Sequence, residues 1–243
     1  MILDIPQDIE VTLKSLKANG FDARFAQTGT DAKKMMLEMI PLTASVGVAD
    51  SVTLRQTGIL EELIRRGTEV INPFKPELTQ GMKENPAQHK LFLETLRRTF
   101  GTDVFVTGSN AVTEDGKIVS IDGAGNRVAG IIYAAPKVIL AIGRNKIVKD
   151  VDAAIDRIKN VLAPAHAKQK RYKTPCTVTG KCSDCDSPDR ICNITVILEK
   201  KSYHADLSVI LINEDLGLGW SPAWDEKRIS EIKSNYYENS WPF

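Results

Sequence analysis

The chain has 243 residues, of which 42% are hydrophobic and 26% are charged, and its net charge at pH 7 is +1. This composition is typical of a globular protein with one sizeable domain, or one domain with an appendage. The near-neutral charge argues against a nucleic-acid partner and against an acidic membrane surface. No window approaches the roughly 18 uninterrupted apolar residues of a membrane span. Asp4, Asp8 and Glu10 interrupt the first residues, so we expect no secretory signal and a cytoplasmic location.

Helical patterns and short apolar runs alternate through the first part of the chain. Thr30 is expected to cap one helix, and Gly20, Pro41 and Gly67 are expected to end three of them. In chain order, we expect a helix over residues 9–19, a strand over residues 22–26, a helix over residues 30–40, a strand over residues 44–49, a helix over residues 59–66 and a strand at residues 70–71.

The same reasoning continues to residue 165. Gly101 and Pro164 are expected to end helices, and Asp115-Gly116 is the turn of a small hairpin. In chain order, we expect a helix over residues 92–100, a strand over residues 103–106, a hairpin arm over residues 117–121, a strand over residues 137–142 and a helix over residues 151–163.

This alternation of helices with continuously apolar strands predicts an α/β fold, with a mostly parallel sheet covered by helices on both faces. Such a sheet binds ligands in the loops at the carboxyl ends of its strands. The composition changes after residue 165. We therefore expect an α/β domain over residues 1–165, a cysteine-rich metal-binding segment over residues 166–193, and a C-terminal part over residues 194–243. Apolar runs at residues 194–198 and 207–212 are expected to return strands to the sheet.

Bulky aromatic residues gather in the tail from Gly217 onward. All three tryptophans lie there, and so does the pair Tyr236-Tyr237; the tryptophans are Trp220, Trp224 and Trp241. Such residues pack on the body of their own domain or on a partner subunit. We expect packing on the domain, with a homo-oligomer as the alternative.

Every cysteine of the chain lies in one short segment with the spacing C-x5-C-x2-C-x6-C. In a reducing compartment, clustered cysteines indicate metal ligands before disulfides. Gly180 and Pro188 supply backbone bends, while the positive charges of Lys181 and Arg190 favour thiolates. The predicted metal ligands are Cys176, Cys182, Cys185 and Cys192.

An iron–sulfur cluster, expected to be of the four-iron type, is favoured over zinc as the occupant of this segment. Structural zinc sites usually show two separated short-gap pairs, and here only Cys182 and Cys185 form such a pair. A four-iron cluster accepts four thiolates at irregular spacing. A zinc knuckle and a set of free thiols remain alternatives. A further alternative is a three-cysteine cluster with one open iron, in which Cys176 is the missing ligand.

Polar side chains in the loops after the predicted strands can hold a small anionic molecule. Glu114 is the candidate general base, and Arg144 beside Lys146 can bind an anion. The candidate contacts are Asp50, Ser51, Thr53, Asn110, Asp122, Asn126, Arg127 and Lys146. Ordinary helix caps and turns are the competing explanation for these loops. The histidines, at positions 89, 166 and 204, are not at ligand spacing, and each is expected to be a surface or packing residue.

The ordered loops at residues 107–116, 122–127 and 143–148 resemble those of the LUD-domain family, also called lactate-utilization C-type or YkgG-like proteins. The likeness covers most of residues 1–215, and the cysteine segment resembles an extension that some members carry. The resemblance implies a fold like the sugar-phosphate isomerase and coenzyme A transferase superfamily. It also implies a link to oxidation of lactate to pyruvate together with iron–sulfur partner proteins. The glutamate that transferases acylate has no counterpart in this sequence, so that activity is not carried over.

The sequence supports three functions. The first is a cluster-bearing protein of lactate or related organic-acid metabolism, associated with an electron-transfer step. The second is an enzyme of isomerase or transferase type on a small anionic substrate, with a structural zinc. The third is a non-catalytic module that senses redox state or binds a partner. Whether the protein is an enzyme is left open by the sequence.

Overall fold

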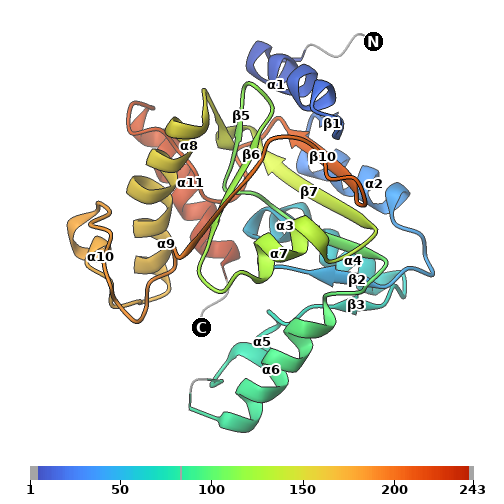
Figure 1. Cartoon of the computed structure of the whole chain (residues 1–243), viewed down its shortest axis with the longest axis horizontal. Helices are drawn as coiled ribbons and strands as arrows, with labels where there is room; N and C mark the ends of the chain where they lie inside the picture. The colour runs from blue at the N-terminus through green and yellow to red at the C-terminus, as the bar shows by residue number, and fades with distance from the viewer. Residues whose placement is uncertain (1–4, 83, 241–243) are drawn as a thin grey trace.

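The computed structural model describes residues 5–82 and 84–240. Ten strands in this part of the chain form two sheets (Figure 1). The central sheet has the order β1-β10-β7-β4-β2-β3, and all its neighbouring strands are parallel. Its strands are β1 (Asp22–Ala26), β2 (Val46–Val48), β3 (Val70–Ile71), β4 (Val104–Thr107), β7 (Lys137–Gly143) and β10 (Asp206–Ile212).

The second sheet has the order β8-β5-β6-β9. Its strands are β5 (Ala111–Thr113), β6 (Ile118–Asp122), β8 (Ile147–Val148) and β9 (Ile194–Leu198). β5 pairs in parallel with β8, while β6 is antiparallel to both β5 and β9. The expected α/β fold with a mostly parallel sheet is therefore confirmed, and the hairpin around Asp115-Gly116 joins β5 to β6.

Helices cover both faces of the central sheet and also pack against the second sheet. None of the helices in the described ranges is long and apolar enough to cross a membrane. The helices are α1 (Gln7–Ala18), α2 (Gly29–Met39), α3 (Val52–Thr57), α4 (Ile59–Arg65), α5 (Pro76–Thr79), α6 (Pro86–Arg98), α7 (Asn126–Tyr133), η1 (Arg144–Lys146), α8 (Val151–Arg157), η2 (Ile158–Leu162), α9 (Ala163–Gln169), α10 (Cys176–Thr179) and α11 (Glu226–Asn239).

β7 lies inside the central sheet and is buried on both faces, which is why its sequence is continuously apolar. Val138, Leu140 and Ile142 pack on one side in a core that includes residues of α1 and α7. Ile139 and Ala141 point to the other side, into a core with α2, α3 and α4. A third core lies between the second sheet, α8, η2 and α11.

The chain returns twice to the sheets after the cysteine segment, but only the second of the two expected strands joins the central sheet. β10 enters the central sheet between β1 and β7, and β9 forms an edge of the second sheet. Trp220 and Tyr236 of the aromatic tail are buried in the third core, against this chain's own residues. The third tryptophan of the tail, Trp241, lies outside the described residues.

Several helix boundaries differ from those expected from the sequence. The helix expected over residues 92–100 begins earlier, and α6 spans Pro86–Arg98. Thr28, not Thr30, caps α2, because the Thr28 hydroxyl accepts a hydrogen bond from the Asp31 amide at 3.1 Å. Pro164 does not end the helix that begins at Val151. A π-helical stretch, η2, precedes the proline, and α9 continues beyond it. Such a wide turn accommodates a residue that has no N–H to donate.

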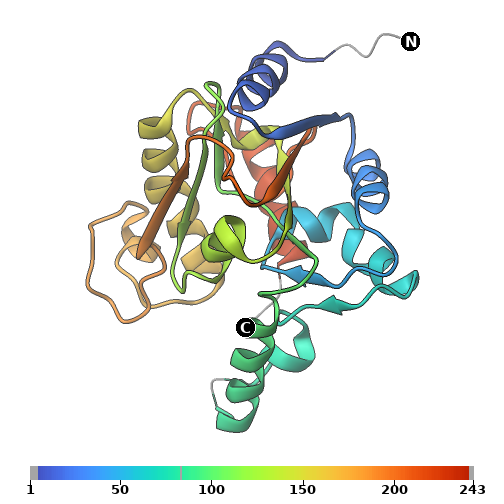
Figure 2. The ribbon, with the colours of Figure 1, turned by 45° about the vertical axis from the view of Figure 1, so that its right-hand side comes forward.

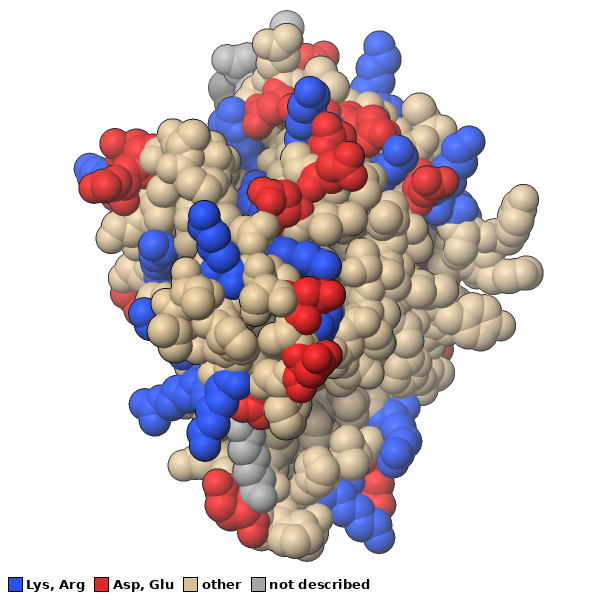
Figure 3. All heavy atoms as spheres, turned by 60° about the vertical axis from the view of Figure 1, so that its left-hand side comes forward, with Lys and Arg blue, Asp and Glu red and all other residues tan. Residues whose placement is uncertain are grey.

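α5 and α6 project from the body of the molecule, as Figures 1 and 2 show from two directions. No residue of α6 is buried, although its sequence is amphipathic. On the face drawn in Figure 3, acidic and basic side chains are interspersed among uncharged residues. This mixture agrees with the net charge of +1.

Candidate functional site

A cavity of about 510 Å³ lies at the carboxyl ends of the central strands. Because these strands are parallel, the loops that follow them meet at one edge of the sheet. Asp50 follows β2, Asn110 follows β4, Lys146 follows β7 and Gly217 follows β10, and all four line the cavity. The opposite wall comes from other elements, through His166 of α9, Tyr236 of α11, and Phe92 and Leu96 of the projecting helix α6.

The three residues of η1, after β7, have separate structural roles. Arg144 points away from the cavity and makes a two-pronged ion pair with Asp8 of α1, with both N···O distances 2.9 Å. Asn145 is fully buried and donates to the Gly219 carbonyl at 2.9 Å. Its side-chain oxygen accepts from the Leu216 amide at 3.1 Å, so Asn145 fixes the loop that follows β10. Lys146 lines the cavity.

Lys146 is a buried lysine whose Nζ donates a hydrogen bond to the Thr53 hydroxyl at 2.9 Å. Burial lowers the pKa of Lys146 from 10.5 to about 7, and the nearby positive charges of Arg127 and Arg157 act in the same direction. Arg157 also holds the backbone of this loop, because its guanidinium donates to the Lys146 carbonyl at 2.8 Å. At neutral pH a large fraction of Lys146 is therefore an uncharged amine.

Two glycines pack closely beside the Lys146 amine. A Cβ at Gly217 would lie 2.8 Å from Lys146 Nζ and 2.6 Å from the Thr53 hydroxyl oxygen. A Cβ at Gly108 would lie 2.8 Å from the Ser51 hydroxyl oxygen and 3.7 Å from Lys146 Nζ. Gly217 also has a φ of +70°, a backbone conformation that side-chain-bearing residues rarely adopt. Only glycine at position 217 is compatible with this arrangement of the amine.

Arg127 supplies a guanidinium at the start of α7. It donates to the Asn110 side-chain oxygen at 2.8 Å and to the Ile121 carbonyl at 2.7 Å. The Asp122 carboxylate lies 3.8 Å from Arg127 and also accepts from amides in the first turn of α7, including that of Val128 at 3.3 Å. Asp122 therefore caps the helix and also pairs with the Arg127 guanidinium, which lines the cavity wall. Burial lowers the pKa of Arg127, but a guanidinium stays charged in proteins.

A second charged group faces the cavity from the loop after β2. Asp50 pairs with Arg55 at 2.7 Å. Burial acts to raise the Asp50 pKa, but the positive charges of Arg55 and Lys170 outweigh it, and the net effect is a lowered pKa. Asp50 is consequently ionised at neutral pH.

His166 is a cavity residue that the sequence does not indicate. Its Nδ1 lies 2.5 Å from the hydroxyl oxygen of Tyr236. Burial lowers the His166 pKa to about 4, and the opposing influence of the Asp50 carboxylate does not overcome it. The imidazole is therefore neutral at physiological pH. The sequence carries no signal for this pair, because 70 positions separate the two residues.

All but one of the predicted contact residues line the same cavity. Thr53 does not line the cavity but contacts it through Lys146. Ser51 caps α3, with its hydroxyl accepting from the Leu54 amide at 3.4 Å. The predicted contacts that line the cavity are Asp50, Ser51, Asn110, Asp122, Asn126, Arg127 and Lys146.

The structure places Glu114, the candidate general base, away from this cavity. It is exposed in the β5–β6 turn, whose backbone carbonyls at Asp115 and Gly116 accept from Asn19 after α1. The turn lies outside the cavity wall, so Glu114 is not placed to act as a base on a ligand there. The prediction for Glu114 requires that all residues after β4 face one cleft. In the structure, β5 (Ala111–Thr113) separates Asn110, which lines the cavity, from Glu114, which does not.

All four cysteines are half-buried free thiols. Burial raises the pKa of Cys192, and the neighbouring thiols of Cys182 and Cys185 raise it further, while Arg190 lowers it. The sulfurs of Cys182 and Cys185 are thus close enough to Cys192 to affect its ionisation. Within residues 5–82 and 84–240, however, no three metal-ligating side chains converge at the geometry of a metal site. Cys176 lies on α10, with its sulfur 3.2 Å from the Thr174 hydroxyl oxygen.

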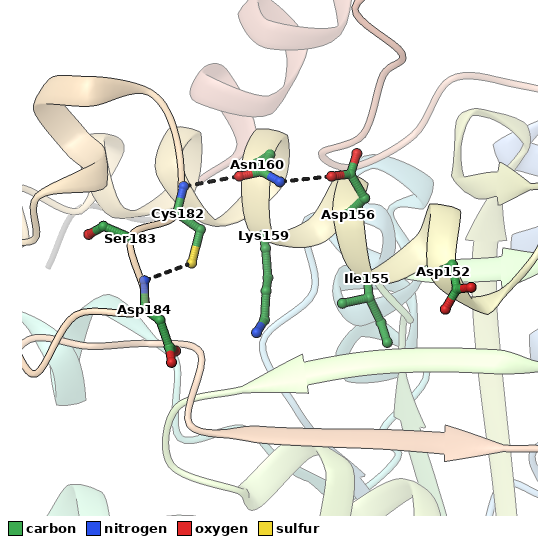
Figure 4. Close-up of a pocket in the computed structure, with 8 residues that line it drawn as sticks. All are labelled: Asp152, Ile155, Asp156, Lys159, Asn160, Cys182, Ser183 and Asp184. Atoms are coloured by element: carbon green, nitrogen blue, oxygen red, sulfur yellow. Dashed lines mark hydrogen bonds between the residues drawn. The ribbon is translucent and has the colours of Figure 1, made fainter.

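Polar groups surround the sulfur of Cys182, as Figure 4 shows. The Asp184 amide donates to this sulfur at 3.4 Å, and the Cys182 amide donates to the side-chain oxygen of Asn160 at 3.0 Å. Lys159 extends along the same hollow, whose volume is about 430 Å³. Thiols beside an amide donor and positive charge suit an anionic thiolate-bound metal centre. The donor set therefore fits an iron–sulfur cluster in its chemistry.

The cysteine segment borders the cavity directly. Ile191, next to Cys192, lines the cavity. Its backbone lies so close to Gly123 that a Cβ there would be 3.1 Å from the Ile191 Cα. Asn193 ties the same two stretches together, since its amide donates to the Asp122 carbonyl at 3.1 Å. The loop that carries Arg127 thus has the cysteine segment packed against it.

The sequence model of the LUD domain family matches residues 9–212. No curated protein matches the sequence. Among solved structures, a DUF162 family protein from Deinococcus radiodurans shares 14% sequence identity with a TM-score of 0.47, over 85% of this chain and 96% of that chain. The family match spans most of the sequence, including every loop of the cavity that precedes residue 213 and the whole cysteine segment. The chain belongs to the LUD domain family.

Proposed function

We propose that this LUD-domain protein binds a small organic anion in the cavity and holds an iron–sulfur cluster in its cysteine segment, in lactate or related organic-acid metabolism. The observation that carries the proposal is the shared wall: Ile191, adjacent to Cys192, lines the same cavity as Arg127 and Lys146. A cluster held by the cysteines would therefore lie close to a bound ligand. Such a cluster accepts and donates single electrons.

The size and charge of the cavity support a small anionic ligand. A volume of about 510 Å³ is within the range of small-molecule sites. Arg127 provides a permanent positive charge at the wall, with Asn110 holding it in place. The apolar side chains of Phe92 and Leu96 line another part of the cavity. This combination favours a carboxylate with a short carbon skeleton.

The metal part of this proposal is tested by metal and sulfide analysis of anaerobically purified protein. We expect about four irons and four sulfides per chain, with broad absorbance near ~400 nm. Cys192→Ser should lose most of the iron, while Asp186→Asn, a change of an exposed side chain in the same segment, should retain it. One equivalent of zinc and no sulfide would contradict the electron-transfer role. That result would favour the alternative of an isomerase-type or transferase-type enzyme with a structural zinc.

The ligand part is tested by calorimetric titration with lactate, pyruvate, a sugar phosphate and a coenzyme A ester. We expect one of the two small carboxylates to bind, and Arg127→Gln to weaken that binding at least tenfold, since a charge-assisted hydrogen bond contributes about 1.5–3 kcal/mol. Arg98→Gln is the matched control, because Arg98 is an exposed arginine outside the cavity wall. Absence of binding by every ligand would contradict the proposal. It would leave a redox-sensing module as the remaining candidate if the cluster is present.

A further inference from the structure

Lys146 lacks the partner that a buried ammonium group normally has. In the described part of the chain, its Nζ donates to a neutral hydroxyl, that of Thr53, and no carboxylate forms an ion pair with it. The charged groups that act on Lys146 are Arg127 of α7 and Arg157 of α8, and both are cations. A lysine that only binds an anion must carry a positive charge. Burial and the two neighbouring cations disfavour that charged form of Lys146.

We propose that Lys146 is the catalytic nucleophile of the cavity and forms an imine with a small oxo acid, a ligand that carries both a carbonyl and a carboxylate group. This inference rests on the proposed function, because it requires that the cavity bind a small organic anion. It adds to that function a covalent step, a substrate class and a residue that performs the step.

The geometry places the amine at the cavity and holds it in position. Lys146 lines the cavity, and the backbone of Gly217 packs so closely beside the amine that a Cβ there would lie 2.8 Å from Nζ. Thr53 is a positioning residue, because its hydroxyl accepts one N–H of the amine at 2.9 Å and fixes the direction of the others. The loop itself is rigid, since Arg157 and Asn145 hold its backbone and its neighbour through buried hydrogen bonds.

Arg127 and Lys146 differ in charge near neutral pH, and each suits a different group of the ligand. Arg127 remains charged and can hold the carboxylate of the ligand. Lys146 is largely uncharged near neutral pH, because its pKa is about 7. A neutral amine binds an anion poorly but attacks a carbonyl well. The site thus has one group suited to each functional group of an oxo acid.

Imine formation between Lys146 and the oxo acid releases one water and needs no further reactant. The lone pair of Lys146 Nζ attacks the carbonyl carbon, the C–N bond forms, and the C=O π electrons pass to the oxygen. That oxygen then takes up both amine protons in turn and leaves as water, and the nitrogen and carbon become joined by a double bond. Protonation of this imine draws electrons from the adjacent carbon, which activates that carbon for proton loss.

Reductive trapping with borohydride tests the inference on the full-length protein. Pyruvate and acetoacetate serve as the oxo-acid probes, and lactate serves as the probe without a carbonyl. We expect about one reduced adduct per chain at Lys146, located by peptide mass spectrometry, with one of the oxo acids and none with lactate. Trapping should increase as the pH rises through about 7, because the fraction of neutral amine increases.

Two variants and one separate measurement make the result decisive. Lys146→Arg should abolish the adduct, whereas Lys168→Arg, a change of an exposed lysine on the neighbouring helix α9, should leave it unchanged. Calorimetric binding of the same oxo acid is measured in parallel. Binding without an adduct, or an adduct at other lysines that persists in Lys146→Arg, would overturn the imine and leave the proposed anion site intact. If the protein without substitutions shows neither binding nor an adduct, the proposed function is overturned as well.

Discussion

Replacing Lys146 with methionine is expected to make the protein more stable, by about 2 kcal/mol of unfolding free energy at pH 6. Methionine fills a similar volume without a charge, and Lys146 is only 5% exposed. The lysine pKa is 10.5 when unfolded and about 7 when folded. Below pH 7 the folded state therefore carries the full cost of a buried charge, and this cost decreases as the pH rises toward 10.5.

Urea denaturation at pH 6 and pH 9 measures this effect. The gain of Lys146→Met over the unchanged protein should be larger at pH 6 than at pH 9. Lys90→Met is the control, because the Lys90 side chain is 78% exposed, and it should show no such difference. A loss of stability at both pH values would mean that the amine contributes more through its Thr53 hydrogen bond than its burial costs, and would argue against a strained functional lysine.

Replacing Gly217 with alanine is expected to disable the cavity while leaving the fold in place. The new Cβ would lie 2.6 Å from the Thr53 hydroxyl oxygen and 2.8 Å from Lys146 Nζ, both closer than atoms approach in proteins. The left-handed backbone at this position adds a cost of about 1–2 kcal/mol for alanine. Because the lysine end is the flexible partner, Nζ would move, and oxo-acid trapping and affinity should both decrease at least tenfold.

Gly219→Ala provides a control two residues away in the same loop. Its Cβ would lie 3.5 Å from the Asn145 carbonyl oxygen and 3.7 Å from Lys146 Cγ, which are ordinary contacts. Gly217→Ala should therefore show a lower unfolding temperature and weaker ligand binding than Gly219→Ala, as measured by thermal unfolding and ligand titration. Equal behaviour of both variants would mean that the position of the Lys146 amine does not govern the cavity.

Local patterns in the sequence are enough to predict the central sheet. The strand expected over residues 22–26 coincides with β1, and the continuous apolar run of β7 marks a strand buried on both faces. Because parallel strands end at one edge of a sheet, the same patterns also predict that the loops after β2, β4 and β7 meet. These inferences depend on short stretches of chain, and for that reason they need no information about distant contacts.

Local sequence patterns do not predict contacts between segments that are far apart in the chain. His166 reaches Tyr236 from another helix, and nothing near Gly217 in the sequence indicates that Lys146 and Thr53 lie beside it. Proline lacks an N–H, so the sequence predicts a helix end at Pro164, yet a π-helical stretch accommodates this residue. The sequence alone also does not orient the thiols of the cysteine segment, whose few apolar residues leave its conformation to neighbouring elements.

The position of β10 has a consequence for how the chain acquires its fold. β10 pairs through five residues with β1 and through seven with β7, so it separates two strands that do not otherwise pair. During synthesis, β10 emerges only after the cysteine segment and β9. Until then β1 has no partner and β7 presents an open edge, and such edges pair readily with other chains. A chain that stalls or is cleaved within the cysteine segment would thus leave these strand edges unpaired and be prone to aggregate.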